Sequence, residues 1–538
     1  MNHDPIRMLL CALPLFTLAC STAPARPTAS LDPQPADLAP GAIAADMGAD
    51  PTVVTDAGDG GSAPVSDPGG GDMSDSALAP TATAVDPVAG PPGVQVTVTG
   101  RGFRSGDVVQ LSTGNAVVAL ATVSLASTLI VATLPSSTPA GVGNVTVKRA
   151  SRVSKPLPFS VTSGRVYYLA PNGSDNNPGT LASPWATLEN ATAQLQPGDL
   201  LYLRGGSYSF ASAVTSNGTA AAPITIQGYP GEQPLLIAPA GSARYDTLSI
   251  QGSYLTFDHL RISDLVAQAS SVEIIASAHD VTLSNCDIYG SLGVGMIIAG
   301  SHNNFLRNRI HDNGSYHKNE GIYIEGAYNV LRGNLVYNNW DYGIQLYNEL
   351  VTDGSEGHNL VEGNYVFHNG YGAKNAGISN DTAGMILSKG HANDIVRNNI
   401  FCDNADWALQ VELNLPNQQV SGNVSCYNHT GGFFFPSPGS NNTFTNNISY
   451  NDAAPALSGM APLVSDDNLY FSTSGAPTLQ WNFGGNLSLA AFQSATQQDG
   501  HSKVANPGFK NVPSSGFDAT RAESYDFCTA LNPSLCTH

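Results

Sequence analysis

The chain carries little charge, and very little of that charge is positive. Charged side chains make up 12% of its 538 residues, and 22 Lys and Arg face 42 Asp and Glu, for a formal net charge of −20. A nucleic-acid site needs a basic surface that neutralises phosphates, so this composition excludes nucleic acid as an expected partner. An anionic glycan is still compatible with it, provided that local Lys or Arg, or a bridging cation, balances the charge.

Long apolar segments are also scarce. The apolar stretch near the start of the chain, residues 8–18, is too short to cross a bilayer. It follows a weakly basic head formed by His3 and Arg7, which is the order found in export signals. We therefore expect residues 1–20 to be a signal peptide and the protein to be exported.

The end of this signal carries a further motif. Thr17-Leu18-Ala19-Cys20 resembles the lipobox of bacterial lipoproteins, whose cysteine becomes the lipidated first residue. Since Ser21, and not Asp, follows, the resemblance implies an outer-membrane lipoprotein anchored through Cys20; simple secretion is the alternative. Residues 21–80 hold almost no large apolar side chains and are expected to form a disordered acidic tether.

The most informative pattern is a phrase that recurs between residues 293 and 451. A glycine opens an apolar–any–apolar run, and an Asn, an Ile or Val and a second Asn follow, as in 295–298 with 308–313. A period in the low twenties indicates a solenoid, whose units bury their apolar faces by stacking. Two short alternating strands per unit predict an all-β fold, a parallel β-helix. Further copies begin at Gly321, Gly343, Gly384, Ala408 and Gly432.

The recurring Asn residues are expected to be structural. Stacked Asn side chains at the corners of coils satisfy the backbone groups of the turns and one another. The predicted ladder consists of Asn308, Asn334, Asn364, Asn398 and Asn446.

Five cysteines follow Cys20. Cys402 and Cys426 occupy the same slot of adjacent coils, about 4.8 Å apart, which is within the Cα range of a disulfide. Cys528 and Cys536 are predicted to close a second, small loop, and Cys286 to be a buried free thiol. Export favours these bridges; five free thiols are the alternative.

Residues 81–162 differ from the rest. They show short alternating strands at the spacing of a β-sandwich. The Pro-x-x-Gly opening and Val-Thr-Val-Thr-Gly-x-Gly-Phe at 96–103 resemble the IPT/TIG immunoglobulin-like domains. The resemblance implies a small immunoglobulin-like β-sandwich that acts as a spacer or as a binding module.

The segment 165–208 opens the third part. Its stretch 167–180, the run Pro184-Trp185-Ala186-Thr187-Leu188 and an amphipathic helix to about Leu195 resemble the N-terminus of exported right-handed parallel β-helix proteins, including the family-9 polysaccharide lyases (pectate lyases). The resemblance implies that residues 165–538 form a right-handed parallel β-helix, with a cap at 165–208 and a covering segment at 452–538.

One outer face of the middle coils is the predicted groove. In Gly-apolar-x-apolar-x the alternate residues point outward, and tyrosines there suit stacking on sugar rings. Loops inserted at 311–320, 349–358 and 371–382 are expected to wall this face. The candidate substrate-binding residues are Tyr323, Glu325, Gln345, Tyr347 and Glu412.

Cleavage of a uronate glycan by β-elimination needs a base for the C5 proton, a neutraliser for the carboxylate and an acid for the leaving oxygen. Lys318 is the first candidate for the base and Lys389 the second. His311 or His317 is the candidate neutraliser, and Tyr323 or Tyr347 the acid. A hydrolytic pair of Glu325 and Glu412 is disfavoured, because two coil steps place them about 10–15 Å apart.

The family resemblance also implies a Ca²⁺ site. Family-9 lyases bind Ca²⁺ through Asp residues in and before a strand and use a strand Lys as base. The run 341–345 resembles their Asp-Asp-Gly-Phe-Asp, and 384–390 their Gly-Phe-Lys-Leu-Gly-Gly, with Ile386 at the position of the Lys. Glu320, Asp341 and Asp381 are the candidate metal ligands.

Together these patterns predict a monomeric cell-surface protein that acts on a polysaccharide, with a lyase as the leading hypothesis. A non-catalytic glycan-binding or adhesion protein is the alternative, and structural surface display is a third class. No membrane contact is expected beyond the lipid anchor.

Overall fold

The computed structural model describes residues 79–114, 116–210, 212–239, 246–264, 270–349, 351, 356–377, 382–412, 414–513 and 516–529. The predicted signal peptide with Cys20, nearly all of the predicted tether, Asp381 and Cys536 lie outside these residues. Within the described part of the chain, no helix is long and apolar enough to span a membrane.

The first folded region is a two-sheet β-sandwich, as predicted for residues 81–162. Alternating side chains such as Val96, Val98, Val109, Leu111 and Ile130 are fully buried in its core. One sheet has the order β1 (Thr81–Asp86), β3 (Gln95–Arg101), β7 (Leu129–Thr133), β6 (Ala121–Ala126), all antiparallel. The other has the order β2 (Ala89–Gly90), β10 (Leu157–Val161), β8 (Gly141–Arg149), β4 (Val108–Thr113), β5 (Ala116–Ala119), with β9 (Arg152–Val153) paired to β8.

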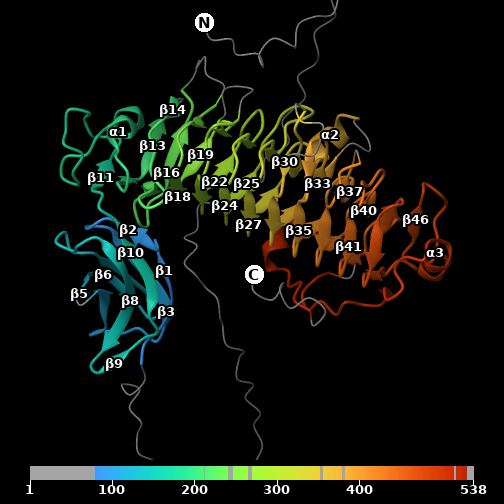
Figure 1. The fold of residues 1–538 in the computed structure, drawn as a ribbon, viewed down its shortest axis with the longest axis horizontal. Helices are drawn as coiled ribbons and strands as arrows, with labels where there is room; N and C mark the ends of the chain where they lie inside the picture. Colours follow the sequence, from blue (N-terminus) through green and yellow to red (C-terminus); the bar gives the residue numbers. More distant parts are fainter. Residues whose placement is uncertain are drawn as a thin grey trace, which may run out of the picture. The chain divides into compact units, whose positions relative to one another are not determined.

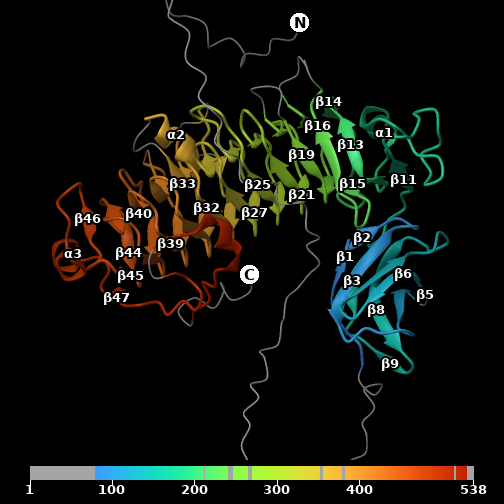
Figure 2. The same ribbon diagram turned by 180° about the vertical axis from the view of Figure 1, so that it is seen from behind.

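From Val166 onward the chain winds into a parallel β-helix, whose strands stack in chain order along three sheets (Figure 1; Figure 2 from behind). Sheet 1 contains β11 (Val166–Leu169), β12 (Leu200–Leu203), β15 (Ile224–Gly228), β18 (Leu255–Asp258), β21 (Thr282–Ser284), β24 (Asn304–Leu306), β27 (Val330–Arg332), β31 (Leu360–Glu362), β35 (Ile395–Arg397), β38 (Gln419–Ser421), β41 (Thr443–Thr445) and β44 (Val464–Asp466).

Sheet 2 contains β13 (Gly206–Ser209), β16 (Pro234–Ile237), β19 (Arg261–Ser263), β22 (Asp287–Tyr289), β25 (Arg309–His311), β28 (Leu335–Tyr337), β32 (Tyr365–Phe367), β36 (Ile400–Cys402), β39 (Val424–Cys426), β42 (Ile448–Tyr450), β45 (Leu469–Phe471) and β47 (Lys503–Val504). Sheet 3 contains β14 (Ser212–Val214), β17 (Leu248–Ile250), β20 (Val272–Ile274), β23 (Met296–Ile298), β26 (Ile322–Ile324), β29 (Ile344–Leu346), β33 (Ala383–Leu387), β37 (Trp407–Val411), β40 (Gly431–Phe434), β43 (Leu457–Gly459) and β46 (Leu479–Trp481). The short strands β30 (Glu356–Gly357) and β34 (His391–Ala392) pair with each other.

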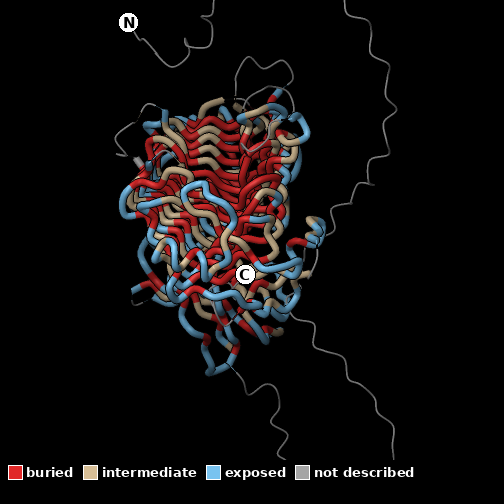
Figure 3. The backbone as a smooth tube through the Cα atoms, turned by 90° about the vertical axis from the view of Figure 1, so that its right-hand side faces the viewer, coloured by how far each residue is buried: buried red, intermediate tan, exposed pale blue. Residues whose placement is uncertain are grey.

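The core of the β-helix is formed by the apolar positions of the repeated phrase. Ile322 and Ile324 of β26, and Ile344 and Leu346 of β29, are fully buried and stack in register. Figure 3 shows the buried parts of successive coils lying above one another in parallel rows. The predicted alternation, apolar inward and alternate residues outward, is therefore confirmed.

Stacked Asn side chains form three ladders in the described coils. In the second and third, an Asn Oδ1 accepts hydrogen bonds from the backbone N–H and the Nδ2 of the preceding coil, as Asn364 does from Asn334 at 2.9 and 2.8 Å. The first ladder runs Asn303, Asn329, Asn359 and Asp394, and the pattern resumes with Gln418 and Asn442; the second runs Asn308, Asn334, Asn364, Asn399, Asn423, Asn447 and Asn468; the third Asn313, Asn339, Asn369, Asn404, Asn428 and Asp452. Buried polar groups paired in this way stabilise the turns.

Two members of the predicted ladder are wrong by one residue. Asn398 and Asn446 adopt left-handed backbone angles, with φ of 56° and 58°, and the next residues, Asn399 and Asn447, enter the ladder. Asn tolerates the left-handed conformation better than most residues, so each Asn-Asn pair supplies a corner residue and a ladder residue.

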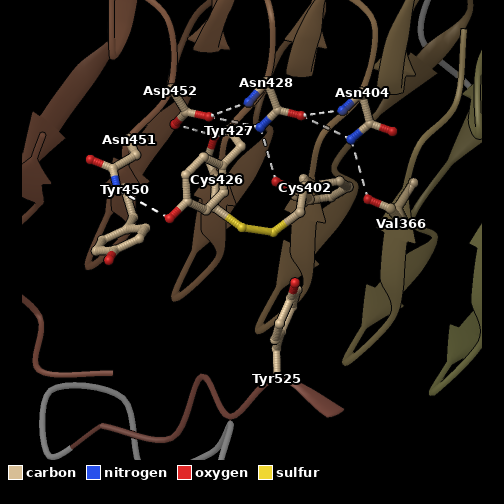
Figure 4. Close-up of a disulfide and its surroundings, with 12 residues drawn as sticks. Val366, Cys402, Asn404, Cys426, Tyr427, Asn428, Tyr450, Asn451, Asp452 and Tyr525 are labelled. Atoms are coloured by element: carbon tan, nitrogen blue, oxygen red, sulfur yellow. Dashed lines mark hydrogen bonds between the residues drawn. A yellow bond between two sulfur atoms is a disulfide. The ribbon is translucent and has the colours of Figure 1, made fainter. Parts of the chain in front are cut away.

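The Cys402–Cys426 disulfide is present, with the Cα atoms 4.5 Å apart (Figure 4). It joins the same outward slot of β36 and β39, beside the third Asn ladder. Cys286 is a buried free thiol, as predicted. Cys528 is disulfide-bonded; its predicted pairing with Cys536 stays a prediction.

Both ends of the β-helix differ in detail from the prediction. The helix α1 (Leu188–Gln194) begins at an N-cap, Thr187, as expected of the cap segment, but β11, β12 and β13 already belong to the sheets. Strands β43 to β47 extend the coils beyond residue 451. The helix α3 (Leu489–Thr496) packs Phe492 against Trp481, and a segment with the 3₁₀ helix η2 (Ala519–Ser524) covers the outer side of sheet 2.

Candidate functional site

The outer face of sheet 3 carries the predicted substrate-binding side chains. Tyr323, Gln345, Ile386 and Gln410 occupy the same slot on four successive strands, β26, β29, β33 and β37. The Tyr323 and Tyr347 rings lie 6.3 Å apart, both facing away from the core. On the last strand, the Gln410 Nε2 donates to the Glu412 carboxylate.

The loop before β26 brings three predicted residues together. The His317 Nδ1 lies 2.8 Å from Asp341 Oδ2, and the Lys318 backbone N–H donates to the same oxygen at 2.8 Å. Lys318 adopts a left-handed φ of 68°, which turns the loop back over Asp341. Asp341 is fully buried, whereas the His317 side chain is partly exposed. A buried carboxylate thus fixes the orientation of a histidine at the edge of the face.

Glu320 is the second buried acid of this group. Burial, and then the charge of Asp341, raise the pKa of Glu320 to about 8, and the nearby Lys318 lowers it. Burial also raises the pKa of Glu325. The pKa of the Tyr323 hydroxyl is raised by burial first and then by the charges of Glu325 and Glu320. At neutral pH, Glu320 is therefore mainly protonated and can donate a proton. The neighbouring His317 is then the candidate for the base. We call His317, Lys318, Glu320 and Asp341 the loop group.

Two predicted catalytic residues lie elsewhere. His311 belongs to β25 of sheet 2, where its ring stacks between Tyr289 and Tyr337 and its nitrogens contact Asp287 and Asp312. Its placement with His317 in one loop was wrong, because residues 309–311 continue the sheet. Lys389 follows β33, two strands along sheet 3 from β26, and its carbonyl accepts a hydrogen bond from Asn348.

The Ca²⁺ site that the resemblance implied does not fit these residues. Asp341 Oδ2 is already engaged by His317 and the Lys318 N–H. Tyr342 packs with Ala383, Ile386 and Trp407 in an apolar cluster. Ile386, at the position of the family lysine, is only 3% exposed. An isoleucine side chain can supply neither a ligand for a cation nor a base at that slot.

A group of side chains that could hold a metal ion exists on another part of the β-helix. The potential ligand atoms of Asp466, Asp467 and His501 lie within 4.8 Å of one another, at the end of β44 in sheet 1. This group is separate from the loop group, whose residues precede β26 and β29 of sheet 3.

A polar cluster at the corner between sheets 2 and 3 was missed by the sequence analysis. Asp403 accepts from His368 Nδ1 at 2.6 Å, from His429 Nε2 at 3.0 Å and from the Tyr371 hydroxyl at 3.1 Å. Burial alone would raise the pKa of Asp403, but the bonds to His368 and then His429 hold it below its usual value. The sequence signal for this cluster was the polar residue that follows each sheet 2 strand. The insertion at 371–382 obscured the alignment of these positions.

Comparisons with known proteins agree with this architecture. Residues 167–460 match the family described as Pel9A-like, right handed beta helix region, and residues 80–161 match the IPT/TIG domain. The uncharacterized protein YwoF of Bacillus subtilis is 30% identical over 139 residues, 24% of this chain and 29% of that protein. Pectate lyase L of Paenibacillus polymyxa is 26% identical over 314 residues, covering 53% and 68%.

Among solved structures, the crystal structure of pectate lyase Pel9A aligns with a TM-score of 0.43 and 18% identity, over 54% of this chain and 76% of that chain. The chain spans less than a third of the first of these curated relatives and about two thirds of the second.

Proposed function

Because the chain belongs to the family of Pel9A-like right-handed β-helix proteins, which its residues 167–460 match, we propose that it is a polysaccharide lyase. It cleaves a uronate-containing glycan by β-elimination at the loop group. The similarity to pectate lyase L supports the reaction class. The observation that carries the proposal is the His317–Asp341 contact beside Glu320, a buried acid whose pKa burial raises to about 8.

The loop group supplies each role that β-elimination needs. The His317 Nδ1–H donates a hydrogen bond to Asp341, so Nε2 is the basic nitrogen and takes the C5 proton of the uronate. The electrons of the C5–H bond form the C4=C5 double bond, and the C4–O4 bond breaks. Glu320 gives its proton to the leaving O4, and the Lys318 ammonium balances the uronate carboxylate. Tyr323 and Tyr347 pack against the sugar rings.

The reaction is tested by mixing the full chain with a panel of polyuronates and following the ultraviolet absorbance of the unsaturated product. We expect product from at least one glycan, and an unchanged rate after treatment with a chelator, because Asp341 serves His317 and not a cation. Product that disappears on chelation and returns with Ca²⁺ would contradict this mechanism. No product from any member of the panel would contradict the proposed activity.

A non-catalytic glycan-binding protein is the second candidate, and one observation favours it. Ile386 occupies the position of the family base and is buried in an apolar cluster with Tyr342 and Trp407. Retained glycan binding without product in the same assay would support this candidate over the lyase.

We also propose that the protein is exported and anchored to the outer membrane through lipidated Cys20. Lipid attachment at this cysteine would be the anchor, with no need for a spanning helix. Replacing Cys20 by serine should move the protein from the membrane fraction to the soluble fraction on cell fractionation. A Cys20→Ser protein that stays in the membrane fraction would show that the lipobox interpretation is wrong.

A further inference from the structure

A cavity of about 390 Å³ lies at the corner between sheets 2 and 3, next to the loop group. It is within the size range of small-ligand sites, roughly 300–1,000 Å³. The residues after β25, β28 and β32 and the start of the helix α2 (Tyr371–Asn375) line it. The lining side chains used below are Asp312, Asn338, Trp340, His368 and Tyr371.

Stacking of the coils makes one side of this corner cavity. Asp312, Asn338, His368 and Asp403 each follow a sheet 2 strand in consecutive coils, and all four adopt left-handed φ angles between 51° and 55°. The repeated corner therefore presents a row of polar side chains at the spacing of the coils, about 4.8 Å. Such a row offers hydrogen-bonding groups at regular intervals.

The polar side of the cavity is held in place by further contacts. The His368 and Tyr371 rings stack with their centres 4.2 Å apart, and the Asp403 carboxylate accepts a hydrogen bond from each of these side chains. The Tyr371 hydroxyl also lies 2.7 Å from His429 Nε2. His368 and Tyr371 are thus fixed before a ligand arrives, which lowers the entropic cost of binding.

Trp340 provides the aromatic wall of the cavity. It stacks on Tyr316, with ring centres 6.4 Å apart, and Tyr316 is 69% exposed. A Cβ at Gly372 would collide with the indole, so this glycine leaves the space that the ring occupies. An aromatic wall facing fixed polar groups is the usual composition of a site for an amphipathic ligand such as a sugar ring.

The charge of the cavity selects among sugars. No Lys or Arg is among the described residues that line it, whereas Asp312 is exposed and its carboxylate contacts His311 Nδ1 at 2.6 Å. The His311 ring is shared between Asp312 and Asp287, and His368 is already held by Asp403, so a uronate carboxylate placed here would meet a like charge without an opposing ammonium or guanidinium. Like charges at close range disfavour binding. The lining therefore favours an uncharged sugar.

The corner cavity and the loop group are built partly from the same two short segments of the chain. Trp340 immediately precedes Asp341, and Tyr316 immediately precedes His317, so the aromatic wall and the His317–Asp341 contact share two short segments. We therefore expect a glycan bound in the corner cavity to reach the loop group.

We propose that this corner cavity is a binding subsite for a neutral sugar residue, a hexose or pentose without a carboxylate, in a heteropolysaccharide whose uronate lies at the loop group. The inference rests on the proposed function for the identity of the neighbouring sugar. The glycan then crosses the corner between sheets 2 and 3 instead of running along sheet 3 alone.

The test measures binding to the full chain by calorimetry, with xylotetraose, galactotetraose and arabinotetraose as neutral probes and tetragalacturonate as the anionic probe. We expect Trp340→Ala to weaken the binding of at least one neutral probe about tenfold or more, and to leave the binding of tetragalacturonate, which the loop group holds, within a few-fold of the wild type. Gly372→Ala, which displaces the indole without removing it, should weaken it as well. Tyr328→Ala, an exposed aromatic between sheets 3 and 1, is the matched control and should bind as the wild type.

Wild-type affinity for the neutral probes in both Trp340→Ala and Gly372→Ala, an equal loss of tetragalacturonate binding in Trp340→Ala, or no binding of any neutral probe would overturn the inference. Thermal unfolding of each variant shows that it is folded. Because binding is measured without cleavage, loss of neutral-sugar binding in Trp340→Ala would support the subsite even if no glycan is cleaved. The absence of cleavage would then count against the proposed lyase activity alone.

Discussion

Replacing His317 by alanine is expected to lower kcat on the glycan that the protein cleaves by about 10²–10⁴, the usual contribution of a positioned general base. KM should change little, because His317 takes a proton in the transition state and the aromatic side chains provide most of the binding. Initial rates of absorbance increase at several glycan concentrations separate the two parameters. The fold should be retained, since the His317 side chain is partly exposed and lies in a loop before β26, outside the strands of the sheets.

His311→Ala is the matched control for this variant. Like His317, His311 contacts carboxylates through its ring and is partly exposed, but it belongs to sheet 2. We expect His311→Ala to keep kcat within a few-fold of the wild type. Comparable losses in both variants would mean that the effect is structural, and a loss in His311→Ala alone would move the reaction to sheet 2.

Replacing Asp394 by asparagine is expected to stabilise the protein at neutral pH by about 2–4 kcal/mol. Asp394 is the acid in the first Asn ladder, where its Oδ1 accepts from the backbone and the side chain of Asn359 at 2.9 Å. Burial raises its pKa from 3.8 to about 7, and each unit is worth about 1.4 kcal/mol. The nearby His391 does not compensate the charge, because burial lowers its pKa to about 4.

The sign of this effect follows from proton linkage. Between about pH 4 and pH 7 the folded chain keeps the Asp394 proton while the unfolded chain has lost it, so the wild type loses stability as pH rises through this window. Asparagine does not titrate and keeps the acceptor oxygen. The gain of Asp394→Asn should therefore be small near pH 4, grow toward pH 7 and then level off.

Thermal or denaturant unfolding at a series of pH values measures this gain. Asp452→Asn is the control in the third ladder: Asp452 is partly buried, and Ser425, Ser449 and Asn428 all donate to it. It should gain less, because asparagine has one acceptor oxygen fewer for these donors. A gain of Asp394→Asn that is independent of pH would show that Asp394 is ionised in the fold throughout.

The sequence was sufficient for the fold because the coil is a local repeat. The Gly-apolar-x-apolar phrase places Ile322 and Ile344 in the core and Tyr323 and Gln345 outside by strand alternation alone. The disulfide followed from the same register. The sequence could not decide which Asn of each Asn-Asn pair enters the ladder, because both residues tolerate a corner, and only the backbone angle separates Asn398 from Asn399.

The candidate site was only partly predictable. His317, Glu320 and Asp341 could be grouped because the insertion before β26 lies next to the following coil. The contact between His368 and Asp403 depends on the strand register between two coils that the insertion at 371–382 separates. The repeat period does not give that register, because the insertion lengthens the coil. His311 was misplaced because a strand of three residues ends where the loop was expected to begin.

The most direct test of the central claim is a crystal structure of the His317→Ala variant with an uncleaved oligosaccharide of the glycan that the wild type cleaves. We predict that C5 of the uronate lies where the imidazole of His317 would reach it, about 3–4 Å from the position that Nε2 occupies in the wild-type protein, with Tyr323 and Glu320 in contact with the same sugar. An oligosaccharide bound over Ile386 and Gln410, or on sheet 2, with position 317 untouched, would contradict the account.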